Sequence, residues 1–288
     1  MTHKTTLHPR GFLVLVCLYL GLAFAQDAPQ REITQIAGDL YRFQNNFHYS
    51  VFLVTPEGII VTDPIDADAA TWLRDELVIR FNQDVKYVIY SHDHADHISG
   101  GEVFKEAGAI VVAHENAKRD IIAEGRSTAL PDITFSDSLT LELGGKTVEL
   151  SYVGRNHSDN SVVMNFPAER TLFAVDFIPV KSLPFQNLPD SYIPDWLDSL
   201  AMVEAMDFDI FAPGHGPLGN KSDVSAMRQY FNDLYNAVLE QAQMGKTLEE
   251  ARAAITLDAY KDWAQYEEFL PLNIEGMFNR IQLQRRGN

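Results

Sequence analysis

The sequence predicts an α/β protein in which two sheets lie face to face with helices outside them, a four-layer αββα sandwich. Two observations predict this fold class. After Gly38, short apolar runs separated by turn residues are followed by helical patterns, and the same order of strands and then a helix returns after residue 137. With 288 residues, 46% of them hydrophobic and 22% charged, the composition is that of an ordinary globular protein.

The first half alternates strands with helices. Leu73, Leu77 and Phe81 recur at four-residue spacing, which is typical of one helix face, and Asp66 and Asp68 precede them as candidate N-caps. Besides this helix, the expected elements are strands at 39–44, 50–54, 59–62, 85–90 and 109–113 and helices near 99–107 and 114–124.

The second half repeats the strand-rich opening. Gly144 and Gly145 form the turn of its first hairpin. The expected elements are strands at 138–143, 147–153, 161–166, 171–175 and 209–212 and a helix near 194–206.

The last part of the chain is predicted to be helical. An apolar stripe at three- and four-residue spacing begins at Val224, and Thr247 with Glu250 makes a capping box. Pro271 is expected to interrupt the final segment. We therefore expect one domain over residues 26–288, with 221–288 as a helical C-terminal extension that walls the site.

The N-terminus has the pattern of a secretory signal peptide at residues 1–25. Lys4 and Arg10 precede an uncharged run that ends in Ala23-Phe24-Ala25. This run is shorter than the ~20 residues that a spanning helix needs, although an uncleaved anchor is the alternative. We expect a periplasmic or secreted protein without stable membrane association after cleavage.

Charge and cysteine content exclude several classes of partner and site. The formal charge is −17, and loss of the leader makes it more negative still, so phosphate backbones are repelled and nucleic acid is a poor partner. The single cysteine, Cys17, cannot form an intramolecular disulfide, a Cys-rich zinc finger or an iron–sulfur cluster. A small-molecule substrate and a metal held by His, Asp or Glu are expected instead.

Five histidines follow predicted strand ends, where functional sites collect in layered α/β folds: His92, His94, His97, His157 and His215. Imidazoles with a carboxylate and no thiol suit zinc. In a near-extended turn, residues i and i+2 point the same way, so His92 and His94 would face one ion while Asp96 and His97 face another. Two cations about 3.5–4 Å apart share an activated hydroxide, a nucleophile at neutral pH.

The order and spacing of four motifs resemble the metallo-β-lactamase superfamily of binuclear zinc hydrolases. They are His92-x-His94-x-Asp96-His97, His157 before Ser158-Asp159-Asn160, Asp176 at a strand end, and His215 in Pro213-Gly214-His215-Gly216. The resemblance covers about residues 38–220 and implies the αββα metallo-β-lactamase fold. It also implies two zinc ions, the first on His92, His94 and His157, the second on Asp96, His97 and His215, with Asp176 bridging them and Asp63 supporting the metal loop.

Within the superfamily, similarity is closest to subclass B1-like lactamases, whose second zinc carries a cysteine. This chain has Asp176 in place of that cysteine and His97 in place of the usual arginine, which is the all-His/Asp set of glyoxalase-II-type hydrolases. Lys181 resembles the lactamase lysine that binds the substrate carboxylate, displaced by two residues. Asn160 is a candidate donor to an oxyanion, and His48 lies in a loop that overhangs the metals in the family.

These observations predict a secreted zinc hydrolase in which metal-bound hydroxide opens a cyclic amide, a lactone or a thioester. Hydrolysis of β-lactams falls within this class, as a main or a side activity. Asp96 is expected to orient the hydroxide or to relay a proton. Two alternatives remain at this point: an oxidoreductase similar to the mononuclear-iron persulfide dioxygenases, and a metal-binding protein without catalysis.

Overall fold

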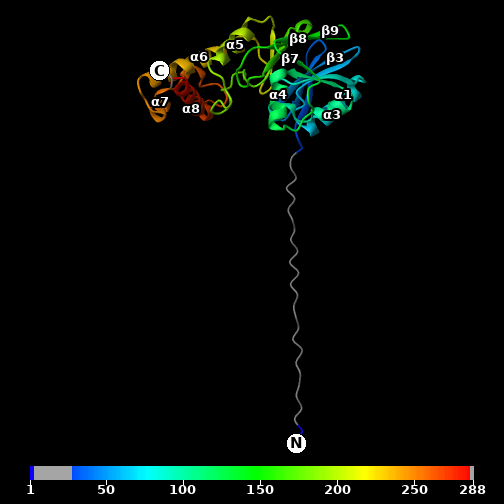
Figure 1. The fold of residues 1–288 in the computed structure, drawn as a ribbon, viewed down its shortest axis with the longest axis horizontal. Coiled ribbons are helices and arrows are strands. Elements are labelled where there is room, and N and C mark those ends of the chain that lie inside the picture. Colours follow the sequence, from blue (N-terminus) through cyan, green and yellow to red (C-terminus); the bar gives the residue numbers. More distant parts are fainter. Residues whose placement is uncertain (3–27, 286–288) are drawn as a thin grey trace.

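Two sheets pack against each other beside the C-terminal helices (Figure 1), in a computed structural model that describes residues 1–2 and 28–285. The first sheet has seven strands in chain order, antiparallel from β1 to β4 and parallel from β4 to β7. Its strands are β1 (Arg31–Ala37), β2 (Leu40–Asn45), β3 (His48–Thr55), β4 (Gly58–Thr62), β5 (Val85–Ile89), β6 (Ile110–His114) and β7 (Ile133–Phe135).

The second sheet has five strands in the order β12-β11-β10-β9-β8. The pair of β11 and β12 is parallel, and the other pairs are antiparallel. Its strands are β8 (Ser138–Leu143), β9 (Lys146–Tyr152), β10 (Val162–Phe166), β11 (Thr171–Ala174) and β12 (Ile210–Pro213).

Helices cover the outer faces of both sheets. The group next to the first sheet comprises α1 (Ala67–Phe81), α2 (Ala95–Ile98), α3 (Gly101–Glu106) and α4 (Glu115–Glu124). The group beyond the second sheet comprises α5 (Asp195–Ala205), α6 (Lys221–Gln243), α7 (Leu248–Ala254) and α8 (Tyr266–Arg285). Figure 1 shows this second group extending sideways from the sandwich. Short 3-10 turns lie at Pro167–Glu169 and Asp258–Tyr260.

Three apolar layers hold the four structural layers together. Between the sheets, Val51 and Ile60 of the first sheet belong to one buried cluster with Leu150 and Phe173 of the second. A separate cluster joins the first sheet to α1, α3 and α4. The third cluster joins β10 and β11 to α5, α6 and α8. This alternation of apolar and structural layers confirms the predicted αββα sandwich with C-terminal helices.

Local signals account for most helix boundaries. Asp66 caps α1 by accepting a hydrogen bond from the Ala69 amide, and Thr247 with Glu250 forms the predicted capping box of α7. The helix expected near 99–107 corresponds to α3, and a separate helix of four residues, α2, precedes it. Between the two helices lies Gly100, whose φ of 87° is left-handed and whose Cβ, if present, would lie 2.6 Å from the Asp66 backbone.

Pro271 does not interrupt the last helix, as the sequence had suggested; it lies inside α8. Its ring costs the helix one backbone hydrogen bond in the second turn. Burial of Ile274, Met277 and Ile281 in the third cluster opposes that loss, and the helix continues.

The predicted leader, residues 1–25, falls mainly on residues 3–27, which lie outside the described part of the chain. Within the described part, none of the helices combines the length and the hydrophobicity that crossing a bilayer requires.

Candidate metal centre

The predicted ligands converge at one edge of the sandwich, beyond the carboxyl ends of four strands. Asp63 follows β4, the His92 loop follows β5, Asp176 follows β11, and His215 follows β12. These strands form parallel pairs within their sheets, so their carboxyl ends meet at the same edge, where ligand sites form in open α/β sheets. His157 joins them from the loop before β10.

One ligand group consists of three histidines and the carboxylate of Asp176. One ligand atom from each of His92, His94, His157 and Asp176 lies within 4.8 Å of the others. Asp176 Oδ2 is 3.3 Å from His92 Nε2 and 3.5 Å from His157 Nε2, and His157 Nε2 is 3.1 Å from His94 Nδ1. This is the set expected for the first metal, including the bridging Asp176.

The second ligand group shares Asp176 with the first. It consists of His97, Asp176 and His215. His97 Nε2 lies 3.2 Å from Asp176 Oδ2, and His215 Nε2 lies 3.1 Å from Asp176 Oδ1. The Asp176 carboxylate therefore stands between the two histidine groups, the position that the sequence assigned to a bridging ligand.

Asp96 lies on the open side of the second group and pairs with His48. Its Oδ2 is 3.2 Å from His48 Nε2 and 3.6 Å from His97 Nε2, and its side chain is 54% exposed. His48, Asp96 and His215 form a further group of possible ligands. His48 was predicted to touch substrate, and its position also gives it access to the metal centre.

The buried ligands differ in their tendency to be charged. Burial, together with the charge of His92, lowers the pKa of His94 to about 4, and burial lowers the pKa of His157 to about 3. Burial also opposes charge on His97, but the Asp176 carboxylate raises the pKa of His97 well above its ordinary value. Likewise, burial favours the neutral acid at Asp176, yet the charge of His97 holds the pKa of that carboxyl well below its ordinary value.

Buried polar atoms at this edge lack hydrogen-bond partners among the described residues. They are His92 Nε2, both ring nitrogens of His97, and Asp176 Oδ1. Other ligand atoms lie at ion-pair distances from them, but the geometry is not that of a hydrogen bond. Buried polar groups in proteins are seldom left without a hydrogen-bond partner. Imidazole nitrogen with carboxylate oxygen is the donor set of zinc, so these residues fit a metal site.

Asp63 lies beneath the loop that carries His92 and His97 and contacts it. It is fully buried, and it accepts hydrogen bonds from Ser91 N at 2.8 Å and Ser91 Oγ at 2.7 Å. Its Oδ2 also lies 3.3 Å from His97 Nδ1, while Ser91 Oγ lies 2.9 Å from His92 Nδ1. Asp63 thus orients two histidines, one directly and one through Ser91.

Arg42 supports the opposite side of the centre and was missed in the sequence. Buried in β2, it donates to the carbonyls of Pro213 and Gly216 at 2.9 and 2.7 Å and so fixes the loop that carries His215. Burial lowers its pKa to about 10. One signal in the sequence could have identified it. Arg42 is two residues after the apolar Leu40, so both side chains lie on the same face of the strand, the face that packs against the other sheet.

The two other predicted substrate contacts have different surroundings. Asn160 is buried, and its amide binds the loop residue Asp93 twice, accepting from Asp93 N at 3.0 Å and donating to Asp93 Oδ1 at 2.9 Å. This position suits a brace for the metal loop. The Lys181 side chain is exposed and makes no hydrogen bond or ion pair within residues 28–285. Substrate binding by either residue stays a prediction.

Comparison with known families agrees with this geometry. The model of the metallo-beta-lactamase superfamily matches residues 45–215, a segment that contains all the candidate ligands and Asp63 but not Arg42. A solved structure titled metallo-beta-lactamase from Pontibacter korlensis superposes with a TM-score of 0.64 at 23% identity, covering 69% of this chain and 99% of that one.

Three similar proteins are 27–28% identical to this chain. Metallo-beta-lactamase type 2 of Elizabethkingia meningoseptica is 28% identical over 205 residues, which cover 67% of this chain and 81% of that protein. The Bacillus cereus enzyme of the same name is 28% identical over 59% of this chain and 67% of its own length. The alpha subunit of 2,4-dinitroanisole O-demethylase from Nocardioides sp. (strain JS1661) is 27% identical over 65% of this chain and 58% of that subunit.

Proposed function

Because the chain belongs to the metallo-β-lactamase superfamily, we propose that it is a secreted, zinc-dependent hydrolase that opens a cyclic amide, a lactone or a thioester. Membership of this hydrolase superfamily and the presence of a His/Asp metal-binding cluster rest on the family match and on the ligand groups. We propose in addition that the metal is zinc, that two ions bind per chain, that the substrate belongs to one of these three classes, and that the protein is secreted.

The observation that carries the proposal is the position of Asp176. One of its oxygens lies 3.2–3.5 Å from His92, His97 and His157, and the other lies 3.1 Å from His215. A carboxylate shared in this way by two imidazole groups matches a two-metal site better than a one-metal site. It therefore favours the binuclear hydrolase over a mononuclear-iron oxidoreductase.

The chemistry that two cations supply when bound is activation of water at neutral pH and polarisation of the carbonyl that it attacks. The chain itself holds and orients the reactants. His94 and His157 stay neutral near pH 7 because burial lowers the pKa of each, and neutral imidazole is the form that binds metal. Asp96 stays ionised, since the His48 hydrogen bond and the His97 charge outweigh burial and hold its pKa below its ordinary value. An ionised, exposed carboxylate is suited to orienting a polar reactant.

Export is supported by the sequence of the leader alone. We propose cleavage after Ala25 and a periplasmic or extracellular location, with no nucleic-acid partner for this acidic chain. Cell fractionation and N-terminal sequencing of the mature protein test this part. A protein that retains residues 1–25 in the membrane fraction would contradict it.

Metal analysis and a substrate panel test the catalytic part. We expect about two zinc ions per chain and hydrolysis of at least one of nitrocefin, a simple lactone and S-lactoylglutathione. About one iron per chain with oxygen uptake would favour the oxidoreductase instead. Full zinc content with no activity across the panel would favour a binding protein. Including 2,4-dinitroanisole tests the reaction named for the Nocardioides relative.

Substitution of Asp176 tests the bridging arrangement. Asp176→Asn keeps the size of the side chain but removes the negative charge between the two groups, so we expect bound metal to fall from about two ions to about one or fewer. Turnover should fall at least a hundredfold. Asp75→Asn, on the exposed face of α1, is the matched control and should change neither quantity. Two tightly bound ions in Asp176→Asn would rule out the shared carboxylate.

A further inference from the structure

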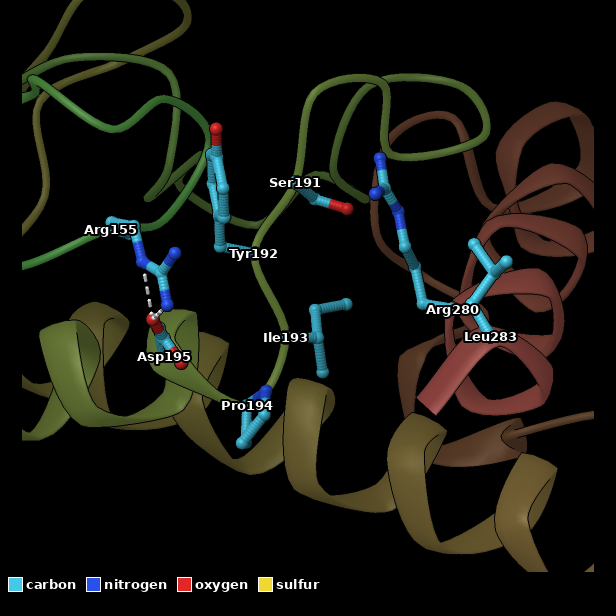
Figure 2. Close-up of a pocket in the computed structure, with 8 residues that line it drawn as sticks. All are labelled: Arg155, Ser191, Tyr192, Ile193, Pro194, Asp195, Arg280 and Leu283. Atoms are coloured by element: carbon cyan, nitrogen blue, oxygen red, sulfur yellow. Dashed lines mark hydrogen bonds and ion pairs between the residues drawn. The ribbon is translucent and has the colours of Figure 1, made fainter. Parts of the chain in front are cut away.

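We propose that Arg280 and Ser191 form a subsite for the carboxylate group of an extended substrate, at the junction between the C-terminal helices and the sandwich. This inference rests on the proposed function, because it names the class of substrate that the hydrolytic site would accept: an acyl compound with a second, anionic end. Figure 2 shows the cavity that contains both residues.

The cavity is formed by two parts of the chain that are far apart in sequence. The loop before α5 supplies Ser191, Tyr192 and Ile193, and α8 supplies Arg280 and Leu283. In Figure 2 the Ser191 hydroxyl and the Arg280 guanidinium both project into the space between that loop and α8. The volume, about 220 Å³, is enough for a small acid group with the carbon atoms that lead to it.

Arg280 is the cation in this region whose charge is not neutralised. It is half-buried, and it makes no hydrogen bond or ion pair with any other described residue. The other arginine of the cavity, Arg155, donates to Asp195 at 2.7 Å and lies 4.8 Å from the centre of the Tyr192 ring. A partly buried guanidinium has lost some of its water without gaining an acceptor, so a carboxylate there would be strongly favoured.

Ser191 supplies the second polar group. It is 1% exposed, and its Oγ has no hydrogen-bond partner within the described residues. A buried hydroxyl without a partner is uncommon, because it loses the hydrogen bonds that it would make with water. One oxygen of a bound carboxylate could accept a hydrogen bond from Ser191 Oγ, and its second oxygen could accept one from the Arg280 guanidinium.

A neighbouring cavity borders both this subsite and the metal centre. Tyr192 and Arg280 also line a larger space of about 530 Å³, which reaches His94. The two further arginines of that space are already paired, Arg119 with Asp120 and Asp159, and Arg126 with Asp93 and Glu124. A substrate held at His94 could therefore extend past Tyr192 and place its far end beside Arg280.

The two charges that line this larger cavity and are unpaired within the described part of the chain, Asp190 and Arg280, limit which charged ligands can bind there. Asp190 lines it without a cationic partner among the described residues, but Asp190 is exposed and is stabilised by water. Arg280, in contrast, is half-buried, so water stabilises its charge less. The region therefore favours an anion placed at Arg280, and it disfavours a substrate whose negative charge is spread along its whole length.

Steady-state kinetics with a matched substrate pair tests the proposal. The pair is an acyl thioester of 3-mercaptopropionate and the same thioester with the carboxylate blocked as its methyl ester, with the released thiol measured. For Arg280→Gln we expect KM for the acid to rise about tenfold, with kcat and the KM for the methyl ester unchanged. Ser191→Ala should raise KM for the acid about threefold without lowering the unfolding midpoint, since it removes a hydroxyl that has no partner. Equal KM changes for acid and ester would overturn the subsite.

A binding measurement separates failure of the subsite from failure of the proposed function. Glutarate is titrated into metal-free protein, and the arginine Nε–H resonances are followed by NMR. A saturable shift of the Arg280 signal, reduced in Ser191→Ala, supports the subsite even if no substrate in the panel is hydrolysed. No saturable shift of that signal overturns it even if the enzyme is active. Arg80→Gln, which removes a distant cation paired with Glu76, is the control and should alter neither titration nor kinetics.

Discussion

At the scale of the residue, the site depends on side chains that hold the ligands as much as on the ligands. Asp63 is fully buried and has a left-handed φ of 29°, a conformation that non-glycine residues seldom adopt. Strained backbone of this kind persists where the surroundings determine it and is common at functional sites. Both of its oxygens are used by Ser91, and one also lies near His97. The strain is thus found where Asp63 fixes two residues of the metal loop, Ser91 and His97.

Asp63→Asn is expected to weaken metal binding about ten- to hundredfold. The amide replaces one acceptor oxygen with a donor, so it cannot accept from both Ser91 N and Ser91 Oγ while facing His97. Competition with a chelator of known affinity measures the loss. Asp84→Asn, at an exposed position outside the site, is the control. Unchanged affinity in Asp63→Asn would show that the loop keeps its geometry without this carboxylate.

The metal-free centre should hold neutral and charged histidines at the same pH. Burial and the neighbouring His92 lower the pKa of His94 to about 4, while the Asp176 carboxylate outweighs burial and raises that of His97. The unfolded chain protonates His94 near 6.5, so this residue disfavours the folded state progressively as the pH falls from about 6.5 to about 4. Nitrogen shifts measured by NMR at pH 6 should show His94 neutral and His97 protonated. A His94 midpoint near 6.5 would contradict this.

At the scale of the element, α8 is fitted closely to the loop that carries Ser191. Gly276 lies in this helix, and a Cβ there would stand 2.0 Å from the carbonyl oxygen of Asn187 and 2.5 Å from its carbonyl carbon. Asn273, one turn earlier, donates to the carbonyls of Pro184 and Gln186 at 2.9 and 2.6 Å. Helix and loop therefore form one unit, and the distance between Arg280 and Ser191 depends on it.

Gly276→Ala is expected to destabilise the protein by about 1–3 kcal/mol, although alanine favours a helix over glycine by about 1 kcal/mol at an unhindered position. The added methyl group must displace the Asn187 backbone, which has little freedom. Denaturant unfolding measures the change, and Asn279→Ala, an exposed position of the same helix, is the control. An increase in stability equal to that of an ordinary glycine-to-alanine change would mean that the loop moves freely.

At the scale of the whole molecule, the sequence predicted the layers and placed the candidate ligands at strand ends, because both depend on local patterns. Apolar alternation marks the strands, and histidines at strand ends mark the edge where they meet. It did not predict β1 or β7, an exposed edge strand and a three-residue strand with little apolar pattern. Nor did it predict Arg42, Ser191 or Arg280, because their roles depend on long-range packing between segments that no spacing rule connects.

The C-terminal extension is expected to be required for folding of the whole chain. Val224, Met227 and Phe231 of α6 are fully buried in one cluster with Leu172 of the second sheet and Leu200 of α5. Ending the chain at Asn220 removes α6 and so exposes the apolar side chains that it covers, such as Leu172 and Leu200. Each large side chain left in water costs about 1.5–3 kcal/mol. This sum approaches the whole stability of a typical domain.

We therefore expect the chain that ends at Asn220 to lose its cooperative unfolding transition and to bind a dye specific for exposed apolar surface, even with zinc present. The comparison is with full-length protein carrying Met227→Ala, which should lose about 2–5 kcal/mol but still unfold cooperatively. Near-UV circular dichroism and thermal scans distinguish the two. If the shortened chain unfolded cooperatively and bound two metal ions, the outer helices would be an accessory layer, and the second sheet would have to be covered in some other way.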